Sequence, residues 1–303
     1  MKLIFVTFLF IYFIVSIYGG NFVVISYTKN IRTNFKVYSC FFTIYNSKKE
    51  MAQEIAKRFS DIPKQYLLFK LDGIIDGNKF SSITNNGEYF RLSMKNSIEI
   101  IKLRANIHII SLFMFSGQKQ FVCNLGFYSN YKTASECIDD LNKYSKLKSQ
   151  ANLLGKNSRA KTYWYKVWGT CYYYCFSEKN FYVMKAKMLM EINIIRSEYN
   201  RGQLFLNDNL SFLAEIIAQK YSNSTKPDKN IKKSVQIIEL ISKPFGNLLV
   251  NKWYNKYLEN RITPFSRKST VKHFQLLFLS RAREIGIGIA SKGKFLTVTI
   301  KFY

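Results

Sequence analysis

Two histidines and five cysteines are the residues of this 303-residue chain that could support nucleophilic or metal chemistry. His108 and His273 lie in different parts of the sequence, and no spacing ties either of them to a cysteine. A nucleophilic cysteine needs a neighbouring base, and a zinc site needs a closely spaced set of ligands. The sequence therefore predicts no catalytic residue, no metal site and no cofactor. We expect His108 to be structural, because it lies in a strand-like apolar run, Ile107–Phe115.

The first twenty residues have the plan of a secretory signal peptide. One basic residue, Lys2, precedes an apolar run from Leu3 to Ile17, and the small residues Gly19 and Gly20 follow. This order is typical of a segment that is cleaved during export. We expect cleavage near Gly19 or Gly20 and a secreted, extracellular protein. The alternative is a signal anchor, because Phe22–Ile25 prolongs the apolar stretch.

If the protein is exported, its cysteines can form disulfides and its Asn-x-Ser/Thr motifs can carry glycans. In an oxidising compartment most cysteines pair, and an odd number leaves at least one free or bonded to another chain. The sequence does not choose the pairs. Asn209 and Asn223 begin Asn-x-Ser/Thr motifs and are candidates for glycan attachment. The disulfide candidates are Cys40, Cys123, Cys137, Cys171 and Cys175.

Composition and charge narrow the class of protein. Apolar residues make up 48% of the chain, which excludes intrinsic disorder. The 46 Lys and Arg outnumber the 19 Asp and Glu and give a net charge of +27. This excess is spread evenly along the chain, so we interpret it as solvated lysine and predict no nucleic-acid partner. Attachment to an anionic glycan or membrane surface is the alternative.

Two segments of the first half resemble each other at an offset of 83 residues, as from Cys40 to Cys123. Each has an aromatic-rich strand around its cysteine, a polar turn and then an amphipathic helix. We expect two small α+β units here, with chance similarity in a biased composition as the alternative. The aligned pairs are Cys40 with Cys123, Met51 with Ala134, and Ile55 with Ile138. Hairpin turns are expected at Asp72-Gly73, Asp76-Gly77 and Asn86-Gly87.

The pattern changes after a polar, basic linker at 143–161. We divide the chain into a signal peptide (1–20), an N-terminal α+β region (21–160), a cysteine-containing connector (161–182) and a C-terminal domain (183–303). The C-terminal domain begins with long helices and ends in a two-strand hairpin. This mixture predicts an α+β chain whose C-terminal domain is an α/β/α sandwich or an α+β layer fold.

Apolar spacing predicts which faces of these elements are buried. The small residues Gly286, Gly288 and Ala290 alternate with isoleucines in the first strand and would let a helix lie close against it. Further helices are expected at 246–258 and 271–281. The first helix has the stripe Met184, Met188, Ile192, Ile195 and Tyr199. The second, which Asp208 caps, has the stripe Leu210, Leu213, Ala214, Ile217 and Tyr221.

Three stretches of residues 183–303 resemble the CAP superfamily, the cysteine-rich secretory, antigen 5 and pathogenesis-related proteins. The nearest resemblance is to secreted SCP-domain proteins of parasitic nematodes. The stretches are MEINIIRSEYNRGQLFLNDNL, VNKWYNKYLEN and KHFQLLFLSRAREIGIGIAS, and they occur in the family's order. Residues 1–160 carry no such resemblance. The matching residues are Asn193, Arg196, Trp253, Tyr254, His273, Phe274, Gly286 and Gly288.

The resemblance implies a central cleft, which this chain has altered. His273 matches one histidine of the family's site, and Glu239 is the candidate for one of its glutamates. Lys256 stands where the family has another glutamate, and the family's other histidine has no counterpart between residues 109 and 272. A cationic lysine repels a metal ion, and two ligands rarely hold zinc. We interpret His273 and Glu239 as a vestigial cleft, or His273 as a structural residue at a helix start.

The resemblance and the altered cleft together imply a secreted, non-enzymatic CAP-domain protein. It would act as an extracellular binding effector at a host–parasite interface, with a protein as its partner. The alternative is a lipid or sterol carrier, since 26 Phe and 21 Tyr could line an apolar pocket. The lack of a recognisable triad disfavours a protease.

Overall fold

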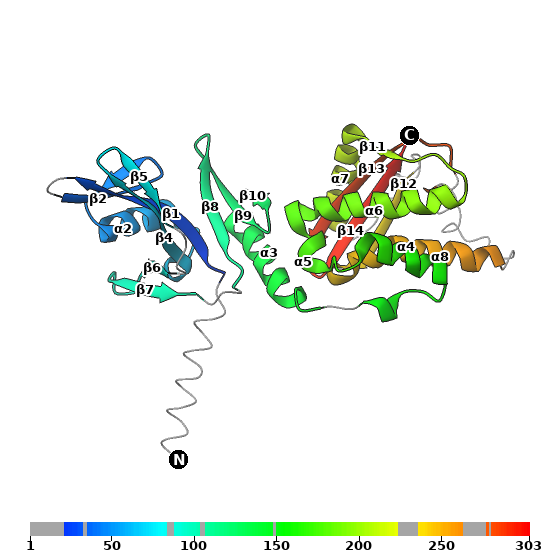
Figure 1. Ribbon diagram of the computed structural model, residues 1–303, viewed down its shortest axis with the longest axis horizontal. Helices are drawn as coiled ribbons and strands as arrows, with labels where there is room; N and C mark the ends of the chain where they lie inside the picture. The colour runs from blue at the N-terminus through cyan, green and yellow to red at the C-terminus, as the bar shows by residue number, and fades with distance from the viewer. Residues whose placement is uncertain are drawn as a thin grey trace, which may run out of the picture. The chain divides into compact units, whose positions relative to one another are not determined.

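The computed structural model describes residues 21–32, 35–83, 88–103, 107–147, 150–223, 236–262, 277–278 and 280–303. The fold is α+β, as the sequence predicted, and it forms two compact units, Met1–Asn142 and Lys143–Tyr303 (Figure 1). The expected signal peptide (1–20), the Asn86-Gly87 turn and most of the expected helix 271–281 lie outside the described residues.

The first unit is built on one mixed sheet with the strand order β10-β9-β8-β1-β4-β6-β7. Strand β2 pairs with β1, β3 with β2, and β5 with β4. Its helical elements are α2 (Lys48–Arg58), the 3-10 turn η1 (Lys64–Tyr66) and α3 (Tyr131–Tyr144). The strands are β1 (Val23–Arg32), β2 (Phe35–Cys40), β3 (Thr43–Tyr45), β4 (Leu67–Asp76), β5 (Lys79–Ser82), β6 (Glu88–Leu92), β7 (Ile98–Lys102), β8 (Ile110–Phe115), β9 (Gln118–Cys123) and β10 (Gly126–Tyr128).

The two similar sequence segments fold alike. The first runs β1-β2-β3-α2 and the second β8-β9-β10-α3, and we call them the first and second copies. Three of the four pairs of counterpart elements begin 83 residues apart, as from Phe35 to Gln118 and from Lys48 to Tyr131. The pairing register is also the same, because Thr28↔Ser39 in the first copy corresponds to Ser111↔Val122 in the second.

Local chemistry explains why each copy folds this way. The helix of each copy begins after a polar cap: Ser47 Oγ accepts from Glu50 N at 3.1 Å, and Asn130 Oδ1 accepts from Thr133 N at 3.0 Å. The predicted apolar faces are buried, since Ile55 is 0% and Ile138 is 1% exposed.

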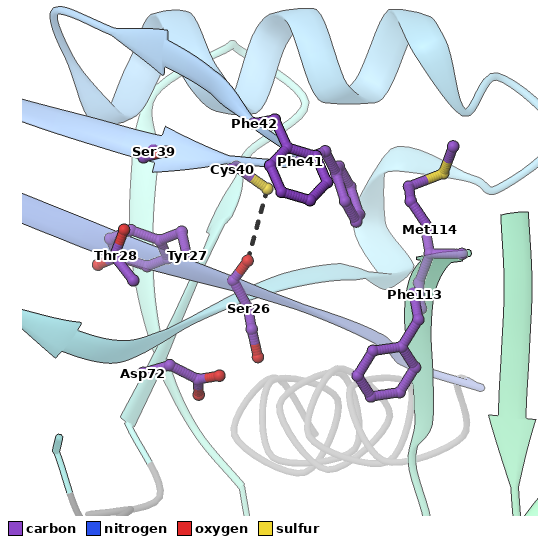
Figure 2. Close-up of a pocket in the computed structure, with 11 residues that line it drawn as sticks. Ser26, Tyr27, Thr28, Ser39, Cys40, Phe41, Phe42, Asp72, Phe113 and Met114 are labelled. Atoms are coloured by element: carbon purple, nitrogen blue, oxygen red, sulfur yellow. Dashed lines mark hydrogen bonds between the residues drawn. The ribbon is translucent and has the colours of Figure 1, made fainter. Parts of the chain in front are cut away.

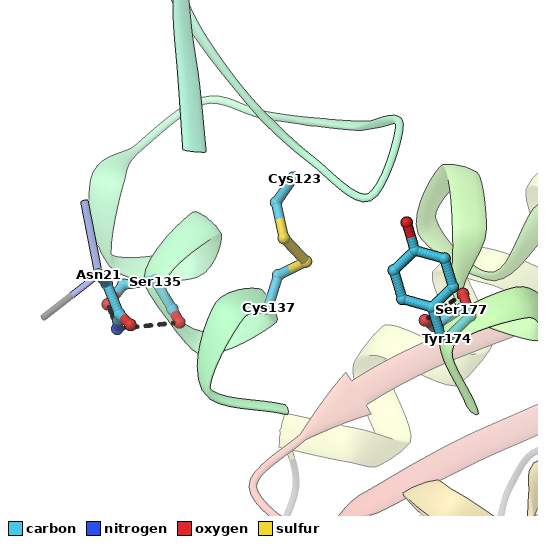
Figure 3. Close-up of a disulfide and its surroundings, with 6 residues drawn as sticks. All are labelled: Asn21, Cys123, Ser135, Cys137, Tyr174 and Ser177. Atoms are coloured by element: carbon cyan, nitrogen blue, oxygen red, sulfur yellow. Dashed lines mark hydrogen bonds between the residues drawn. A yellow bond between two sulfur atoms is a disulfide. The ribbon is translucent and has the colours of Figure 1, made fainter. Parts of the chain in front are cut away.

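Helix α3 of the second copy is also tied down by a covalent bond and by polar contacts (Figure 3). Cys123 at the end of β9 is bonded to Cys137 in α3. Asn21, just before β1, donates from Nδ2 to Ser135 Oγ and to Asp139 Oδ1, the latter at 2.9 Å. These contacts fix α3 to both β9 and the start of β1.

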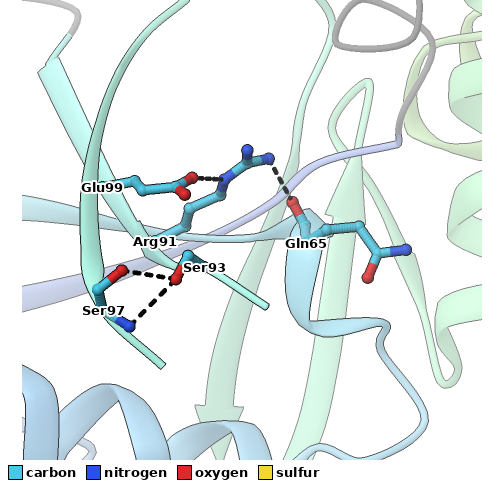
Figure 4. Close-up of polar contacts among 5 residues, drawn as sticks. All are labelled: Gln65, Arg91, Ser93, Ser97 and Glu99. Atoms are coloured by element: carbon cyan, nitrogen blue, oxygen red, sulfur yellow. Dashed lines mark hydrogen bonds and ion pairs between the residues drawn. The ribbon is translucent and has the colours of Figure 1, made fainter. Parts of the chain in front are cut away.

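The β6–β7 hairpin at the far edge of the sheet is held by polar side chains (Figure 4). Arg91 and Glu99 lie opposite each other in the ladder, and Arg91 Nε donates to Glu99 Oε2 at 3.0 Å. Arg91 Nη1 also donates to the carbonyl of Gln65 at 3.3 Å. At the turn, the hydroxyls of Ser93 and Ser97 are 2.7 Å apart. These groups fix the register of the hairpin.

The second unit is an α/β/α sandwich. Its sheet has the order β11-β13-β14-β12; helix α7 packs on β13 and β14, and α6, α8 and η4 lie on the other side of the sheet (Figure 1). Its elements are η2 (Ala151–Leu153), α4 (Ser158–Trp168), α5 (Tyr173–Phe176), α6 (Glu178–Glu198), β11 (Phe205–Leu206), α7 (Asp208–Asn223), β12 (Gln236–Ser242), η4 (Lys243–Leu248), α8 (Leu249–Ile262), β13 (Glu284–Lys292) and β14 (Phe295–Phe302).

The predicted close approach of a helix to the glycine strand is confirmed. On the predicted buried face of that helix Ala214 is buried, the prediction is wrong at Leu213, and Leu210, Ile217 and Tyr221 are partly buried. A Cβ on Gly286 or Gly288 would collide with the backbone of α7 at Leu210 and Ala214. So little space remains that only alanines, Ala214 and Ala218, are buried on α7, and Leu213 is 46% exposed. The stripe of α6 is buried as predicted at Met184, Met188, Ile192 and Ile195.

The expected linker and connector belong to the second unit. The expected boundary at 160 falls within α4, whereas the compact units divide after Asn142. Trp164 of α4 is buried and donates from Nε1 to the carbonyl of Asn247 at 2.8 Å. Aromatic burial therefore makes this segment part of the α/β/α core. Within the described residues no helix has the length and apolar character needed to cross a membrane.

Candidate functional site

The CAP-like residues of the second unit that the structure describes are structural in their contacts. The guanidinium of Arg196 is buried and donates to four carbonyls, those of Gly202, Leu277, Ser280 and Ala282, at 2.9–3.1 Å. Both amide atoms of Asn193 bond the backbone of Leu204: Nδ2 donates to its carbonyl at 3.0 Å, and its N–H donates to Oδ1 at 2.8 Å. These side chains hold the segments that follow α6 and precede β13.

The expected cleft pair cannot be assembled from the described residues. Glu239 lies on β12 opposite Val298 of β14 and is partly exposed. Its expected neighbour His273 lies outside the described residues, as does Phe274. Trp253 and Tyr254 are buried in α8, as core residues are. Among the described residues no cluster of three His, Cys, Asp or Glu side chains could hold a metal ion.

The cysteines form two local pairs and leave one thiol. Cys123 is bonded to Cys137, and Cys171 to Cys175. Cys40 is free and buried. Both glycosylation candidates are exposed on α7: Asn209 lies in its first turn and Asn223 is its last residue.

Figure 2 shows a pocket in the first unit, where the sheet splits. One edge of β1 pairs with β4 from Val23 to Ile31, so β2 and β8 must share the other edge. Strand β8 pairs there at Val23 and Val24, and β2 pairs from Thr28 onward. In this part of the chain, which the structure describes fully, Ile25–Tyr27 pair with neither strand. We call the resulting gap between β1, β2 and β8 the notch.

The notch has a volume of about 350 Å³, and its wall includes the aromatic residues Tyr27, Phe41, Phe42 and Phe113. Three strands and one neighbour line it: Ser26–Thr28 of β1, Ser39–Phe42 at the end of β2, Leu112–Met114 of β8, and Asp72 of β4. Phe42 is 99% and Phe113 is 52% exposed, so large apolar side chains rim the opening. Exposed apolar groups that converge on a concave site are typical of a binding surface.

The ionisable groups of the notch are poor catalysts. Burial raises the pKa of the Cys40 thiol to about 12, and its Sγ lies 3.5 Å from the carbonyl oxygen of Ser26, which it can use as an acceptor. Burial likewise raises the pKa of Tyr27 to about 12. Both groups therefore stay protonated and neutral near pH 7. Asp72, the carboxylate of the lining, lies 3.3 Å from Lys70 Nζ. The arrangement offers hydrophobic contact and hydrogen bonding, without an activated nucleophile.

The aromatic residues of the notch were missed in the sequence, although one signal pointed to them. Phe41 and Phe42 occupy the β2–β3 turn with φ of 48° and 65°. This left-handed conformation normally selects Asn or Gly, and the second copy has Asn124 in the same place. Leu125 of the second copy has the same conformation as Phe42, with φ of 61°. Phe41 packs on Phe59 with ring centroids 5.5 Å apart, whereas Phe42 is 99% exposed at the rim of the notch and bears the cost of this conformation there.

A buried carboxyl in the second unit is chemically unusual but faces no pocket among those described. Glu191 on α6 is fully buried and accepts from Trp168 Nε1 at 2.7 Å. Burial raises the pKa of Glu191 to about 8. The contact joins α4 to α6, so we interpret Glu191 as a structural group.

The first half of the chain matches a protein family. Residues 19–140 match the family described as "Domain of unknown function (DUF7381)". This range nearly coincides with the first unit. No curated protein matches the chain.

Solved structures with some likeness to the chain include the hookworm platelet inhibitor and MpPR-1i. The hookworm protein is 14% identical, with 39% of this chain and 68% of that chain covered and a TM-score of 0.31. For MpPR-1i the identity is 16%, the coverage 39% and 88%, and the TM-score 0.29. An extracellular protein containing an SCP domain from Bacillus anthracis is 10% identical, with 88% and 80% covered and a TM-score of 0.28.

Proposed function

We propose that this chain is an extracellular, non-enzymatic binding protein and that the notch of its first unit is a binding site. The observation that carries the proposal is the chemistry of the notch lining. It combines exposed aromatic rings with neutral hydrogen-bonding groups and the carboxylate of Asp72, which suits the holding of a largely apolar ligand. The two disulfides support an extracellular location, since such bonds persist in oxidising compartments. The partner we expect is a protein.

The size of the notch favours a short apolar group over a whole lipid. At about 350 Å³ it lies at the lower end of small-molecule sites. A sterol or a lipid would leave much of its apolar surface in water, whereas a few side chains of a partner protein would fill the space. Lipid carriage is therefore an outcome of the test and not the function we propose.

The test uses the apolar dye anilinonaphthalene sulfonate and two matched variants. Phe113→Ser removes a ring that lines the notch, and Phe127→Ser removes one that is 70% exposed on β10 and does not line it. We expect the dye to bind the full chain, with binding weakened by Phe113→Ser and unchanged by Phe127→Ser. Equal binding by all three proteins would contradict a site in the notch.

Native mass spectrometry of protein secreted from eukaryotic cells provides the second test. We expect both disulfides formed and no stoichiometric small molecule. A lipid bound at one per chain would replace the proposal with carriage, and a hydrolytic activity of the purified protein would contradict a non-enzymatic role.

A further inference from the structure

The internal repeat of the first unit reveals an empty strand position. In the first copy, Lys29–Ile31 of β1 pair in parallel with Ile74–Asp76 of β4. The counterparts 83 residues later are Leu112–Met114 of β8. Strand β8 has β9 on one edge, and β1 covers its other edge only at Ile110 and Ser111. Within this described part of the sheet, the place that β4 takes beside β1 is unfilled beside β8.

The unfilled position opens into the notch. Leu112, Phe113 and Met114 form one wall of that pocket, and Cys40–Phe42 form the other. Beyond Ser111, the backbone groups on this edge of β8 have no partner strand among the described residues. An exposed strand edge beside apolar side chains is a template for the addition of another strand.

We propose that an extended peptide segment of a partner protein adds to this edge of β8, parallel to it, in the place that β4 takes in the first copy. This inference rests on the proposed function and names its ligand class. Main-chain hydrogen bonds to Leu112–Phe115 would supply part of the affinity. Apolar side chains at alternate positions would enter the notch against Phe42 and Phe113. The net charge of +27 favours a neutral or acidic segment over a basic one.

A synthetic peptide with the sequence of β4, Leu67–Asp76, is the probe. Labelled with a fluorophore and added to the full chain, it should bind saturably in an anisotropy titration. A peptide carrying Ile75→Pro should bind at least about tenfold more weakly, because proline removes a ladder donor and disfavours strand pairing. The peptide control leaves the protein unaltered, so misfolding cannot explain its result.

Matched variants of the protein locate the bound peptide. Phe42→Ser and Leu125→Ser change the same turn position of the two copies, and only Phe42 lines the notch. We expect Phe42→Ser and Phe113→Ser each to weaken peptide binding about tenfold or more, the loss that one buried aromatic ring explains. Leu125→Ser should change it less than about twofold.

The dye and peptide experiments together distinguish a failure of strand addition from a failure of the proposed binding function. Dye binding in the notch without peptide binding would overturn strand addition and leave the binding function standing. Peptide binding that is insensitive to Phe42→Ser and Phe113→Ser would place the peptide elsewhere and also overturn the inference. Failure of both the dye and the peptide to bind would contradict the proposed function itself.

Discussion

The two copies in the first unit have similar sequences and similar local structure, but they differ in their cysteine bonding and in the strands that flank them. Each makes the same hairpin and the same helix, in the same register. The second copy closes with the Cys123–Cys137 disulfide. In the first copy the residue 83 positions before Cys137 is Glu54, so Cys40 has no cysteine to meet. Cys40 is therefore free because α2 has Glu54 where α3 has Cys137.

The copies also differ in what lies beside their first strand. Strand β1 is flanked by β4 along most of its length, whereas β8 is flanked by β1 for only two residues. Similar sequence therefore fixed similar local structure, while long-range pairing decided which strand edge was left open. The open edge and the free thiol both border the notch.

The largest expected effect is a pH dependence that Glu191 gives to the second unit, with stability falling as pH rises. Glu191 has a pKa of about 8 in the folded chain against 4.5 as its ordinary value. Between these values unfolding releases a proton, so stability falls as pH rises, by roughly 1.4 kcal/mol per pH unit. Below the ordinary value the contribution is fully present. Denaturant unfolding followed at several pH values measures the slope.

The variant Glu191→Gln tests whether Glu191 causes this pH dependence of the free energy of unfolding. The amide keeps an oxygen acceptor for Trp168 Nε1 and cannot ionise. We expect the fall in stability with rising pH to be lost through this window, and the variant to be more stable than the unaltered chain at pH 9. A variant that kept the slope would contradict the assignment to Glu191.

Removing the disulfide should make the second copy weaker than the first. The double change Cys123→Ser and Cys137→Ser opens a link across 14 residues and should cost about 3 kcal/mol. Cys40→Ser should cost about 1 kcal/mol, because the Ser hydroxyl can still donate to the carbonyl of Ser26. Urea unfolding of the three proteins gives both values. Equal losses would mean that the disulfide does not distinguish the copies.

Adding the missing cysteine should make the copies alike. Glu54→Cys places a thiol where the second copy has Cys137, whose Cα lies 6.4 Å from that of Cys123. We expect a disulfide with Cys40 and a gain of about 2 kcal/mol. The mass of the intact protein before and after reduction reports the bond, with Glu54→Ser as the control. If Cys40 could still be alkylated in the unfolded, unreduced variant, the equivalence of the two positions would be refuted.

The smallest expected effect is a gain in stability when glycine replaces a residue in the β2–β3 turn or in the β9–β10 turn. Phe42→Gly relieves a side chain with φ of 65°, and Leu125→Gly one with φ of 61°. Each should stabilise the chain by about 1 kcal/mol, because glycine adopts this conformation without strain. Thermal unfolding measures the gain. We expect Phe42→Gly alone to lose peptide binding, so a loss with both variants would break the distinction between the copies.

Much of the fold was predictable because it depends on local patterns. The repeat of strand, turn and helix was visible from the spacing of Cys40, Ile55 and their counterparts. The stripe of α6 and the approach of a helix to Gly286 and Gly288 also followed from periodicity. The exposure of Leu213 on α7 did not, because the close approach of helix and sheet leaves room for Ala214 but not for a larger side chain.

The candidate site was harder to predict than the fold. The notch exists because β1 changes partners between Val24 and Thr28, and such long-range pairing leaves no periodic signal in the sequence. The phenylalanine pair in the turn was the local sign that could have been used. The cleft that the CAP resemblance implied, with His273 and Glu239, stays a prediction.

Hydrogen exchange of the first unit tests the central account most directly, because it compares the two strand edges in one molecule. Without ligand, the amides of Leu112–Phe115 that face the notch should exchange faster than those of Lys29–Ile31 that bond to β4. Addition of the β4 peptide should slow the β8 amides and leave the β1 amides unchanged. Protection of the β8 edge without peptide, or none after the peptide has bound, would contradict an open strand position in the second copy.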